Sequence, residues 1–379
     1  MYQFKQFDPQ SFLTTYWQKK PILLKGLFKD FIDPIEPDEL AGLAQESEIE
    51  SRVVQRQKQA WHVEHGPFDS FEQFGENNWT LLVQAVDHWH LQSAQLLEPF
   101  RFIPNWRIDD LMISFSTPDG GVGAHVDQYD VFIIQGMGKR HWKVGEQQPL
   151  QSSVPHPDLL QVTGFAPCID EVLEPGDVLY IPPGCPHEGY AVEPALNYSV
   201  GFRAPNQQDL LSSFADFALQ EECFQHRYQD PDLQPTQLAG DVTSSEAAKL
   251  IELVKQTLNQ PQQVNKWLGG YLTQAKHEVD IQVPEPSFAE DDVVEINQQI
   301  EAWLRAGGLR ILTLDNGLFV NGEWVDSQSC QAEFVRFISD NLLYSADQLT
   351  EYLQQNDNLA LFSALVNEGY IYPYEDGEE

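Results

Sequence analysis

The order of apolar and polar positions changes twice along the chain. Between residues 110 and 204, short apolar runs alternate with clusters of proline and glycine, and the runs read LMISFS, DVFIIQ, RHWKV, DVLYI and NYSVGF. Many short strands with frequent turn signals predict an antiparallel sandwich or barrel. Residues 1 to about 100 predict mixed helix and loop instead. Within them, residues 79–100 have helix-spaced apolar positions, and we expect that helix to end before Pro99.

After Ala204-Pro205 the apolar spacing becomes helical. Residues 210–226 and 244–272 predict helices with more apolar surface than so small a segment can bury, which indicates docking or dimerisation. A proline-marked break at 283–287 opens a further unit. That unit predicts a helix at 293–305, a hairpin turning at Asn316-Gly317 and more helices. We therefore expect three domains, at 1–207, 208–285 and 286–379.

Composition restricts the class of protein. The chain has 379 residues, 42% hydrophobic and 12% aromatic, as expected for a globular protein with two or three domains. Its start does not resemble a signal peptide, and no apolar run approaches the roughly 20 residues that span a bilayer. The four cysteines form no CxxC pair. This argues against disulfide scaffolds and thiolate zinc, and it predicts a cytoplasmic protein.

The net charge of −36 is the strongest compositional signal. Such a field repels nucleic acids and anionic membranes, so we expect no direct binding to either. Two interpretations remain open, namely solubility and the attraction of a basic protein substrate. The C-terminal unit, residues 286–379, follows the same trend with 18 Asp and Glu against three Arg and no Lys.

His125 and Asp127 form the first candidate metal motif. On a strand, side chains two positions apart point to the same face and can converge on one ion. His187, in the segment PPGCPHEG, supplies a third ligand from another strand. Two imidazoles and one carboxylate make the facial triad of non-haem Fe(II) oxygenases, which leaves positions open for a chelating co-substrate and O2. The presence of the carboxylate favours hydroxylation over halogenation.

Arg140 is the candidate anchor for the co-substrate. A strand at 139–144 places it on one face with Trp142 and Val144, where an arginine needs a compensating anion. The distal carboxylate of 2-oxoglutarate is such an anion. An internal pair with a glutamate, or simple exposure, is the alternative. Ser114 and Ser116 share one face of LMISFS and could donate to the same ligand, although each could equally be structural.

Other histidines and Cys185 do not make a second site. His88 and His90 would lie about 200° apart on a helix, and His62 and His65 lack a third donor nearby in sequence. A thiolate would disturb the facial triad, so we expect Cys185 to be a packed free thiol.

The segments FSTPDGGVGAHVDQYDVFIIQGMGKRHW and EPGDVLYIPPGCPHEGYAV resemble the JmjC branch of the cupin oxygenases, and FLTTYWQKKPILLKG resembles the N-terminal segment of that group. The resemblance covers the whole chain. It implies an α+β protein made of a double-stranded β-helix (the JmjC barrel), a helical dimerisation segment and a winged-helix-like C-terminal domain. An acidic winged helix lacks the basic surface that DNA binding needs, so we expect it to have a structural or protein-contact role.

Within that branch the chain is most similar to the bacterial ribosomal oxygenases. This implies a homodimer that uses Fe(II), 2-oxoglutarate and O2 to hydroxylate an arginine of the sixteenth large-subunit ribosomal protein. The metal ligands then fall on His125, Asp127 and His187, and the 2-oxoglutarate anchor falls on Arg140. Near the motif, Asp119, Asp130 and Glu188 are candidate partners for the target arginine. The alternatives are a JmjC demethylase and a non-catalytic cupin binding module.

Overall fold

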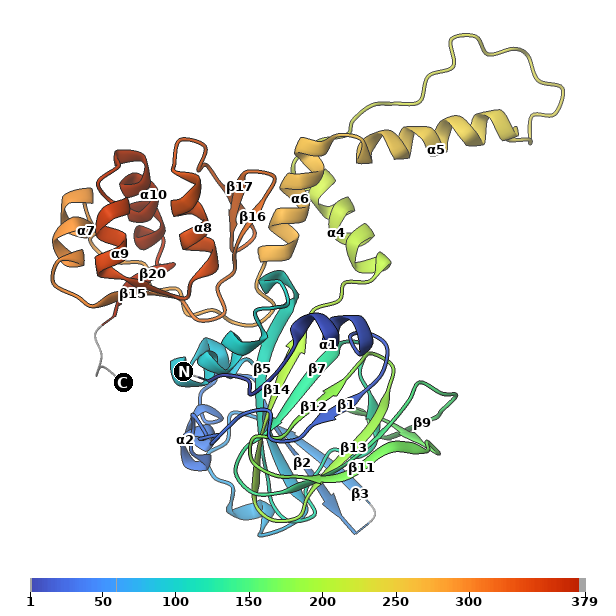
Figure 1. The fold of residues 1–379 in the computed structure, drawn as a ribbon. Helices are drawn as coiled ribbons and strands as arrows, with labels where there is room; N and C mark the ends of the chain where they lie inside the picture. The colour runs from blue at the N-terminus through green and yellow to red at the C-terminus, as the bar shows by residue number, and fades with distance from the viewer. Residues whose placement is uncertain (1, 59, 375–379) are drawn as a thin grey trace.

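The computed structural model describes residues 2–58 and 60–374. An eight-stranded antiparallel sheet runs in the order β1-β12-β7-β14-β5-β4-β2-β3, and a four-stranded sheet has the order β11-β8-β13-β6. A two-stranded hairpin of β9 and β10 protrudes beside them (Figure 1). The bounds are β1 Ile22–Leu24, β2 Ser51–Gln57, β3 Ala60–His65, β4 Trp79–Val83, β5 Ile108–Ser116, β6 His125–Val126, β7 Asp130–Gln135, β8 Arg140–Gly145, β9 Gln151–His156, β10 Leu159–Thr163, β11 Pro167–Leu173, β12 Val178–Ile181, β13 Pro186–Ala191 and β14 Ala195–Phe202.

All five apolar runs predicted as strands are strands, namely β5, β7, β8, β12 and β14. Side chains of β7 show why the barrel forms. Phe132 and Ile134 pack against the N-terminal segment in the main core, whereas Val131 and Ile133 pack between the two sheets. Because successive side chains of a strand point to opposite faces, one fully apolar strand serves both layers.

The expectation of mixed helix and loop before residue 100 is only partly right. The helices there are short, at α1 Pro9–Thr15, α2 Pro37–Leu43 and α3 Leu91–Ala94, with 3₁₀ turns at Glu72–Phe74, Val86–His88, Gln95–Phe100 and Asn105–Arg107. Four strands from this region join the main sheet. The predicted helix at 79–100 is wrong, because its first five residues form the fully buried strand β4 between β2 and β5. Periodicity cannot distinguish so short an apolar run from a helix.

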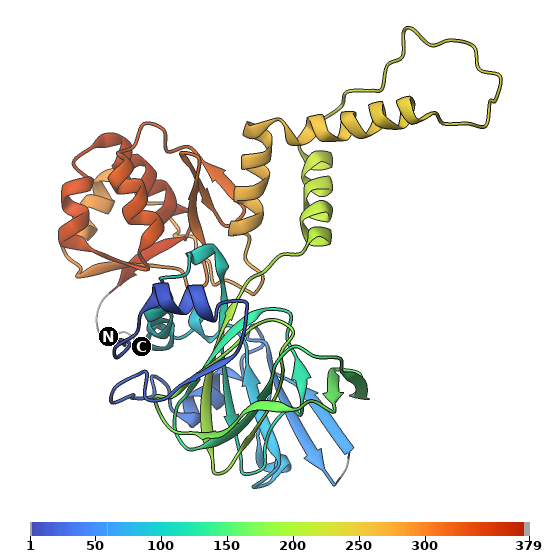
Figure 2. The same cartoon turned by 45° about the vertical axis from the view of Figure 1, so that its right-hand side comes forward.

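Three helices follow the barrel, α4 Gln207–Gln220, α5 Ser244–Leu258 and α6 Pro261–Thr273. The single helix expected at 244–272 is wrong, because Pro261 begins a new helix and has no N–H to continue the old one. Figures 1 and 2 show α5 extending away from the rest of the molecule, while α6 lies between α4 and the C-terminal unit. No described helix is both long and apolar enough to cross a membrane.

The C-terminal unit has its own core around Trp303, Phe334 and Phe362. The expected helix at 293–305 is wrong in its second half, where the chain forms β15. The predicted hairpin is confirmed, with its turn one residue earlier at Asp315-Asn316, both at positive φ. The bounds are α7 Glu290–Asn297, β15 Ala302–Arg305, β16 Ile311–Leu314, β17 Gly317–Val320, β18 Glu323–Val325, α8 Ala332–Asp340, β19 Leu343–Ser345, α9 Ala346–Tyr352, α10 Asn356–Asn367 and β20 Ile371–Tyr374.

Candidate metal centre and catalytic cavity

The three predicted metal ligands lie together between the two sheets. His125 on β6 and His187 on β13 are direct cross-strand partners, and Asp127 follows β6 immediately. The carboxylate Oδ2 of Asp127 is 3.8 Å from Nε2 of His125 and 3.4 Å from Nε2 of His187. All three donor atoms lie within 4.8 Å of one another. Such a cluster of two imidazoles and one carboxylate is the donor set that non-haem iron prefers.

Hydrogen bonds orient both imidazoles toward the shared point. Nδ1 of His125 donates to the carbonyl of Gly123 at 3.0 Å, and Nδ1 of His187 donates to the carbonyl of Cys185 at 3.1 Å. A carbonyl can only accept, so the proton is on Nδ1 and the Nε2 lone pair is free for a cation. Cys185 is a buried free thiol, as expected, and contributes its main chain here.

The charge states suit a divalent cation. Burial and the neighbouring His187 lower the pKa of His125 to about 4, so this ring is neutral at physiological pH. For Asp127, burial raises the pKa, but the neighbouring side chains of His187 and His125 lower it by more, so the pKa lies below its ordinary value. Neutral imidazoles and an ionised carboxylate are the forms that bind iron.

Arg140 is buried, with 4% of its surface exposed, and has no carboxylate partner among the described residues. Its guanidinium donates to the Ser116 hydroxyl at 3.1 Å, the Asn197 side-chain oxygen at 3.3 Å and the Gly189 carbonyl at 3.2 Å. Its Nε has no partner in the described structure. Burial lowers the pKa to about 10, so the group stays charged at neutral pH. An internal Arg–Glu pair is therefore not seen in the described residues, and the guanidinium can pair with the carboxylate of a bound ligand.

The cavity that joins this arginine to the metal cluster has a volume of about 210 Å³. Ser114 lines it, but Ser116 does not; the hydroxyl of Ser116 lies 2.9 Å from that of Thr80 and supports Arg140. Thr80 and Asn197 were not predicted. The only available signal was their polar character within the otherwise apolar runs WTLLV and ALNYSV.

The acidic residues predicted near the metal are not in this cavity. Asp130 is buried elsewhere, where it accepts from Tyr180 at 2.6 Å and pairs with Arg107 at 3.2 Å. Glu188 points away from His187 because neighbouring residues of a strand face opposite sides. Asp119 does not line the cavity either. These three residues are close to the metal motif in sequence, but the fold does not bring them into the cavity.

Asp110 and Asp158 line the cavity instead, together with Arg52 and Tyr129. The Asp110 carboxylate accepts from the Ala85 N–H at 3.1 Å and lies 3.9 Å from His277. Burial, followed by repulsion from Asp87, raises the pKa of Asp110 to about 6. Asp158, at the tip of the β9–β10 hairpin, is 3.3 Å from His65 and 3.6 Å from His156.

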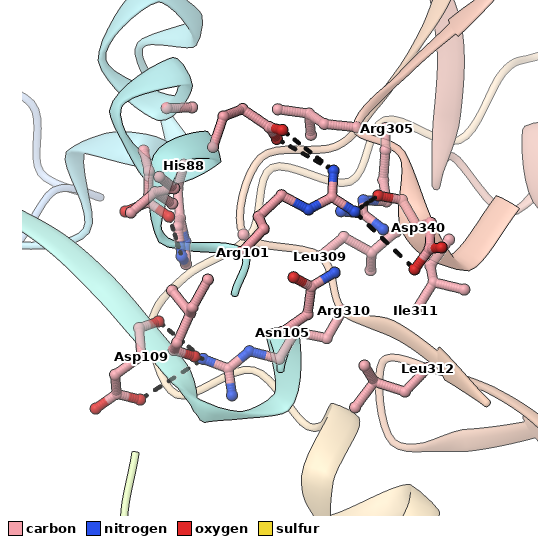
Figure 3. A pocket seen from close by; sticks show the side chains of 17 residues that line it. His88, Arg101, Asn105, Asp109, Arg305, Leu309, Arg310, Ile311, Leu312 and Asp340 are labelled. Atoms are coloured by element: carbon pink, nitrogen blue, oxygen red, sulfur yellow. Dashed lines mark hydrogen bonds and ion pairs between the residues drawn. The ribbon is translucent and has the colours of Figure 1, made fainter. Parts of the chain in front are cut away.

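A second cavity, of about 110 Å³, lies where the barrel meets the C-terminal unit (Figure 3). Arg310 donates there to the carbonyls of Ile108 and Asp109, and Arg101 pairs with Glu98 at 3.2 Å. Nδ1 of His88 donates to the main-chain carbonyl of Glu278 at 2.9 Å, and His88 joins no metal cluster among the described residues. The site is a polar junction between units.

The comparisons with known proteins agree with this geometry. Residues 95–210 match the JmjC domain, and residues 256–372 match the ROXA-like winged helix. The chain is 52% identical over 361 residues to the ribosomal protein uL16 3-hydroxylase of Escherichia coli K12, covering 95% of this chain and 96% of that protein. It is 31% identical over 364 residues to a probable ribosomal oxygenase of Haemophilus influenzae, covering 89% of this chain and 87% of that one.

Solved structures are equally similar. The crystal structure of E. coli YcfD superposes with a TM-score of 0.94 at 51% identity, covering 98% of this chain and 99% of that one. The complex of that ribosomal oxygenase with cobalt and 2-oxoglutarate gives 0.91 at 49% identity, with the same coverage. The expected barrel and winged-helix-like domain are thus confirmed. The chain belongs to the family of JmjC-domain ribosomal oxygenases.

Proposed function

We propose that this protein is an Fe(II)- and 2-oxoglutarate-dependent oxygenase that hydroxylates an arginine side chain of the sixteenth large-subunit ribosomal protein. One observation carries the proposal: a buried arginine without a counter-anion shares a cavity with two histidines and an aspartate. The E. coli relative is named a 3-hydroxylase of ribosomal protein uL16, which points to carbon 3 of the target residue, and its solved complex contains cobalt and 2-oxoglutarate.

In this proposal His125, Asp127 and His187 hold the iron. Arg140 binds the distal carboxylate of 2-oxoglutarate, and Ser114, which lines the same cavity, is the candidate for a further hydrogen bond. Iron held by these residues would supply the oxidising chemistry: 2-oxoglutarate and O2 would give succinate and CO2, with one oxygen atom of O2 in succinate and the other in a C–H bond of the substrate. The protein supplies ligand geometry, a fixed guanidinium and a site shielded from water.

The acid in the cavity supports an arginine substrate. Asp110 on β5 lines the cavity together with Tyr129, and its carboxylate accepts a hydrogen bond from the Ala85 N–H. A guanidinium can pair with it through two parallel hydrogen bonds and can stack on the tyrosine ring. Asp158 is the weaker candidate, because two histidines already contact it at the hairpin tip.

The test is a peptide assay with Fe(II), 2-oxoglutarate and ascorbate. A basic peptide from the ribosomal protein should gain one oxygen atom on its arginine by mass spectrometry, with one succinate formed per product. The same peptide with lysine in place of that arginine should be a poor substrate. Release of formaldehyde from a methylated peptide would support the demethylase alternative, and absence of succinate would support the non-catalytic one.

We also propose that the protein is a homodimer formed through residues 208–285, between a JmjC domain at 1–207 and a C-terminal domain at 286–379. Apolar side chains along α5 support this, because Leu250, Ile251, Val254 and Leu258 are 47% to 66% exposed in the single chain. A second copy is the natural cover for such a surface. The C-terminal domain has 18 Asp and Glu against three Arg and no Lys, a composition that disfavours nucleic-acid binding, so we propose a structural or protein-contact role for it.

A further inference from the structure

We propose that Arg52 binds the main-chain carbonyl of the target residue and so fixes which end of that residue faces the metal. The inference rests on the proposed function above and adds a substrate-binding residue to it. Arg52 lies on β2, half-buried, and lines the cavity that contains the metal cluster.

The guanidinium of Arg52 has no partner of its own. In residues 2–58 and 60–374 it makes no ion pair or side-chain hydrogen bond, and its buried Nε atom is unsatisfied. A half-buried cation in this state is costly unless a ligand completes it. Arg140 was proposed to bind 2-oxoglutarate for the same reason. A second guanidinium without a partner in the same cavity therefore indicates a second hydrogen-bond acceptor, which the substrate would supply.

The position of Arg52 separates it from the co-substrate end. Its cross-strand partner is Leu82, whose own partner is Ser114, whereas Arg140 is held at the Thr80–Ser116 pair. The Leu82–Ser114 and Thr80–Ser116 pairs are two residues apart along the same strands and so face the same side, at a spacing of roughly 7 Å. Arg52 therefore enters the cavity beyond the arginine that takes the distal carboxylate, on the side of Ser114.

The chemistry of hydroxylation at carbon 3 supplies the acceptor. That carbon is bonded directly to the α-carbon, so the main chain of the target residue must enter the cavity with it. Its carbonyl then loses water and needs a donor. Arg52 can donate to that carbonyl but repels the target guanidinium, which Asp110 attracts. The two charges thus orient the target residue in one direction.

Arg52 and the three metal ligands line the same cavity. A carbonyl held by Arg52 would therefore lie in the cavity that contains the metal site, as hydroxylation of the adjacent carbon requires.

The test uses Arg52→Gln and, as a matched control, Arg56→Gln. Arg56 is on the same strand and same face but is exposed and stacks on Trp61 at 5.6 Å, outside the cavity. With Mn(II) in place of iron, calorimetry should give a peptide Kd about ten- to a hundredfold higher for Arg52→Gln. The Kd of 2-oxoglutarate should change less than about twofold, and Arg56→Gln should match the wild type in both measurements.

A second peptide probes the carbonyl itself. Replacing the amide after the target residue by an ester makes that carbonyl a poorer acceptor. The wild type should bind the ester peptide less tightly, and this penalty should shrink in Arg52→Gln, as in a double-mutant cycle. An equal ester penalty in both proteins would overturn the proposal, as would a loss of 2-oxoglutarate affinity instead of peptide affinity.

Thermal unfolding tests the alternative that Arg52 stabilises the fold and does not bind substrate. An unpartnered cation destabilises the fold, so Arg52→Gln should have a Tm equal to or above that of the wild type. A fall of several degrees would show an internal role and overturn the proposal. If the wild type hydroxylates no arginine peptide, the proposed function fails. If it does and Arg52→Gln binds that peptide as tightly, only the role of Arg52 fails.

Discussion

At the scale of single residues, the catalytic cavity collects side chains whose charges the chain itself leaves uncompensated. Arg140 is buried and has no anionic partner in the part of the chain that the structure describes. Nε2 of His125 and Nε2 of His187 each present a lone pair to Asp127, because the proton of each ring is on Nδ1. Elsewhere in the barrel a buried acid such as Asp130 is fully satisfied by Tyr180, Gln18 and Arg107. Within this cavity, the unpaired polar groups mark where a ligand would complete the structure.

We expect Asp127→Ala to abolish hydroxylation while the protein stays folded. The change leaves two imidazoles, so the affinity for Mn(II) measured by calorimetry should fall by about a hundredfold or more. Asp170→Ala is the control, since Asp170 pairs with His141 on the outer face of the barrel. Hydroxylation at the wild-type rate by Asp127→Ala would exclude this carboxylate as a ligand.

Arg140→Ala should raise the concentration of 2-oxoglutarate needed for turnover and leave Mn(II) binding nearly unchanged. Losing a buried, charge-assisted pair costs about 2–5 kcal/mol, or one to several decades in Kd. Titration of 2-oxoglutarate into the Mn(II)-loaded variant measures this directly. An unchanged dependence on 2-oxoglutarate would move the anchor to another residue.

The pKa of Asp110, raised to about 6 by burial and by Asp87, predicts the pH dependence of substrate binding. As the pH falls below 6 this carboxyl gains a proton and loses its attraction for a guanidinium. KM for the arginine peptide should therefore rise, with a limiting slope of about tenfold for each pH unit. Asp109 and His277 are the other charged groups near it. In Asp110→Asn, KM should be high at every pH; a slope that persists in this variant would assign the titration to another group.

At the scale of elements, sequence periodicity located the strands of the barrel and misjudged the helices around them. β7 and β12 were predictable because β-branched residues and flanking turn signals agree. β4 was not, because its buried face depends on pairing with β2 and β5. The helix expected at 244–272 ignored Pro261, which separates α5 from α6 and lets α5 extend outward.

The exposed apolar side chains of α5 allow the proposed dimer interface to be tested by mutation. Val254 is 66% exposed on α5, so Val254→Glu places a charge in the proposed dimer interface and should yield monomers in light scattering at micromolar concentration. Glu252→Gln, on the same helix, should leave the mass unchanged. A wild-type protein that is already monomeric at that concentration would remove the case for this interface.

At the scale of the whole molecule, the charge of −36 acts at a distance that no single contact reaches. Some of the few cations lie at the junction between units, where Asp109 pairs with Lys276 at 2.8 Å and with Arg203 at 3.3 Å, next to the cavity in Figure 3. The remaining surface is strongly acidic and suits a basic partner.

If this field draws the substrate, turnover at subsaturating peptide should fall as salt rises. The Debye length shrinks from about 10 Å at 0.1 M to about 3 Å at 1 M, which screens attraction between separated charges. Measuring kcat/KM across that range tests the idea, with kcat at saturation as the control for damage by salt. A rate indifferent to ionic strength would leave solubility as the reason for the acid.

The sequence by itself determined the metal motif, the strand that carries Arg140 and the family resemblance, because these depend on spacing within short segments. Only the tertiary structure decided which polar residues complete the site. Strand pairing brings Thr80 and Asn197 to Arg140, and the sheet register places Asp110 and Arg52 in the cavity while Asp130 and Glu188 are elsewhere. Register and strand order arise from contacts between distant segments, which no local pattern encodes.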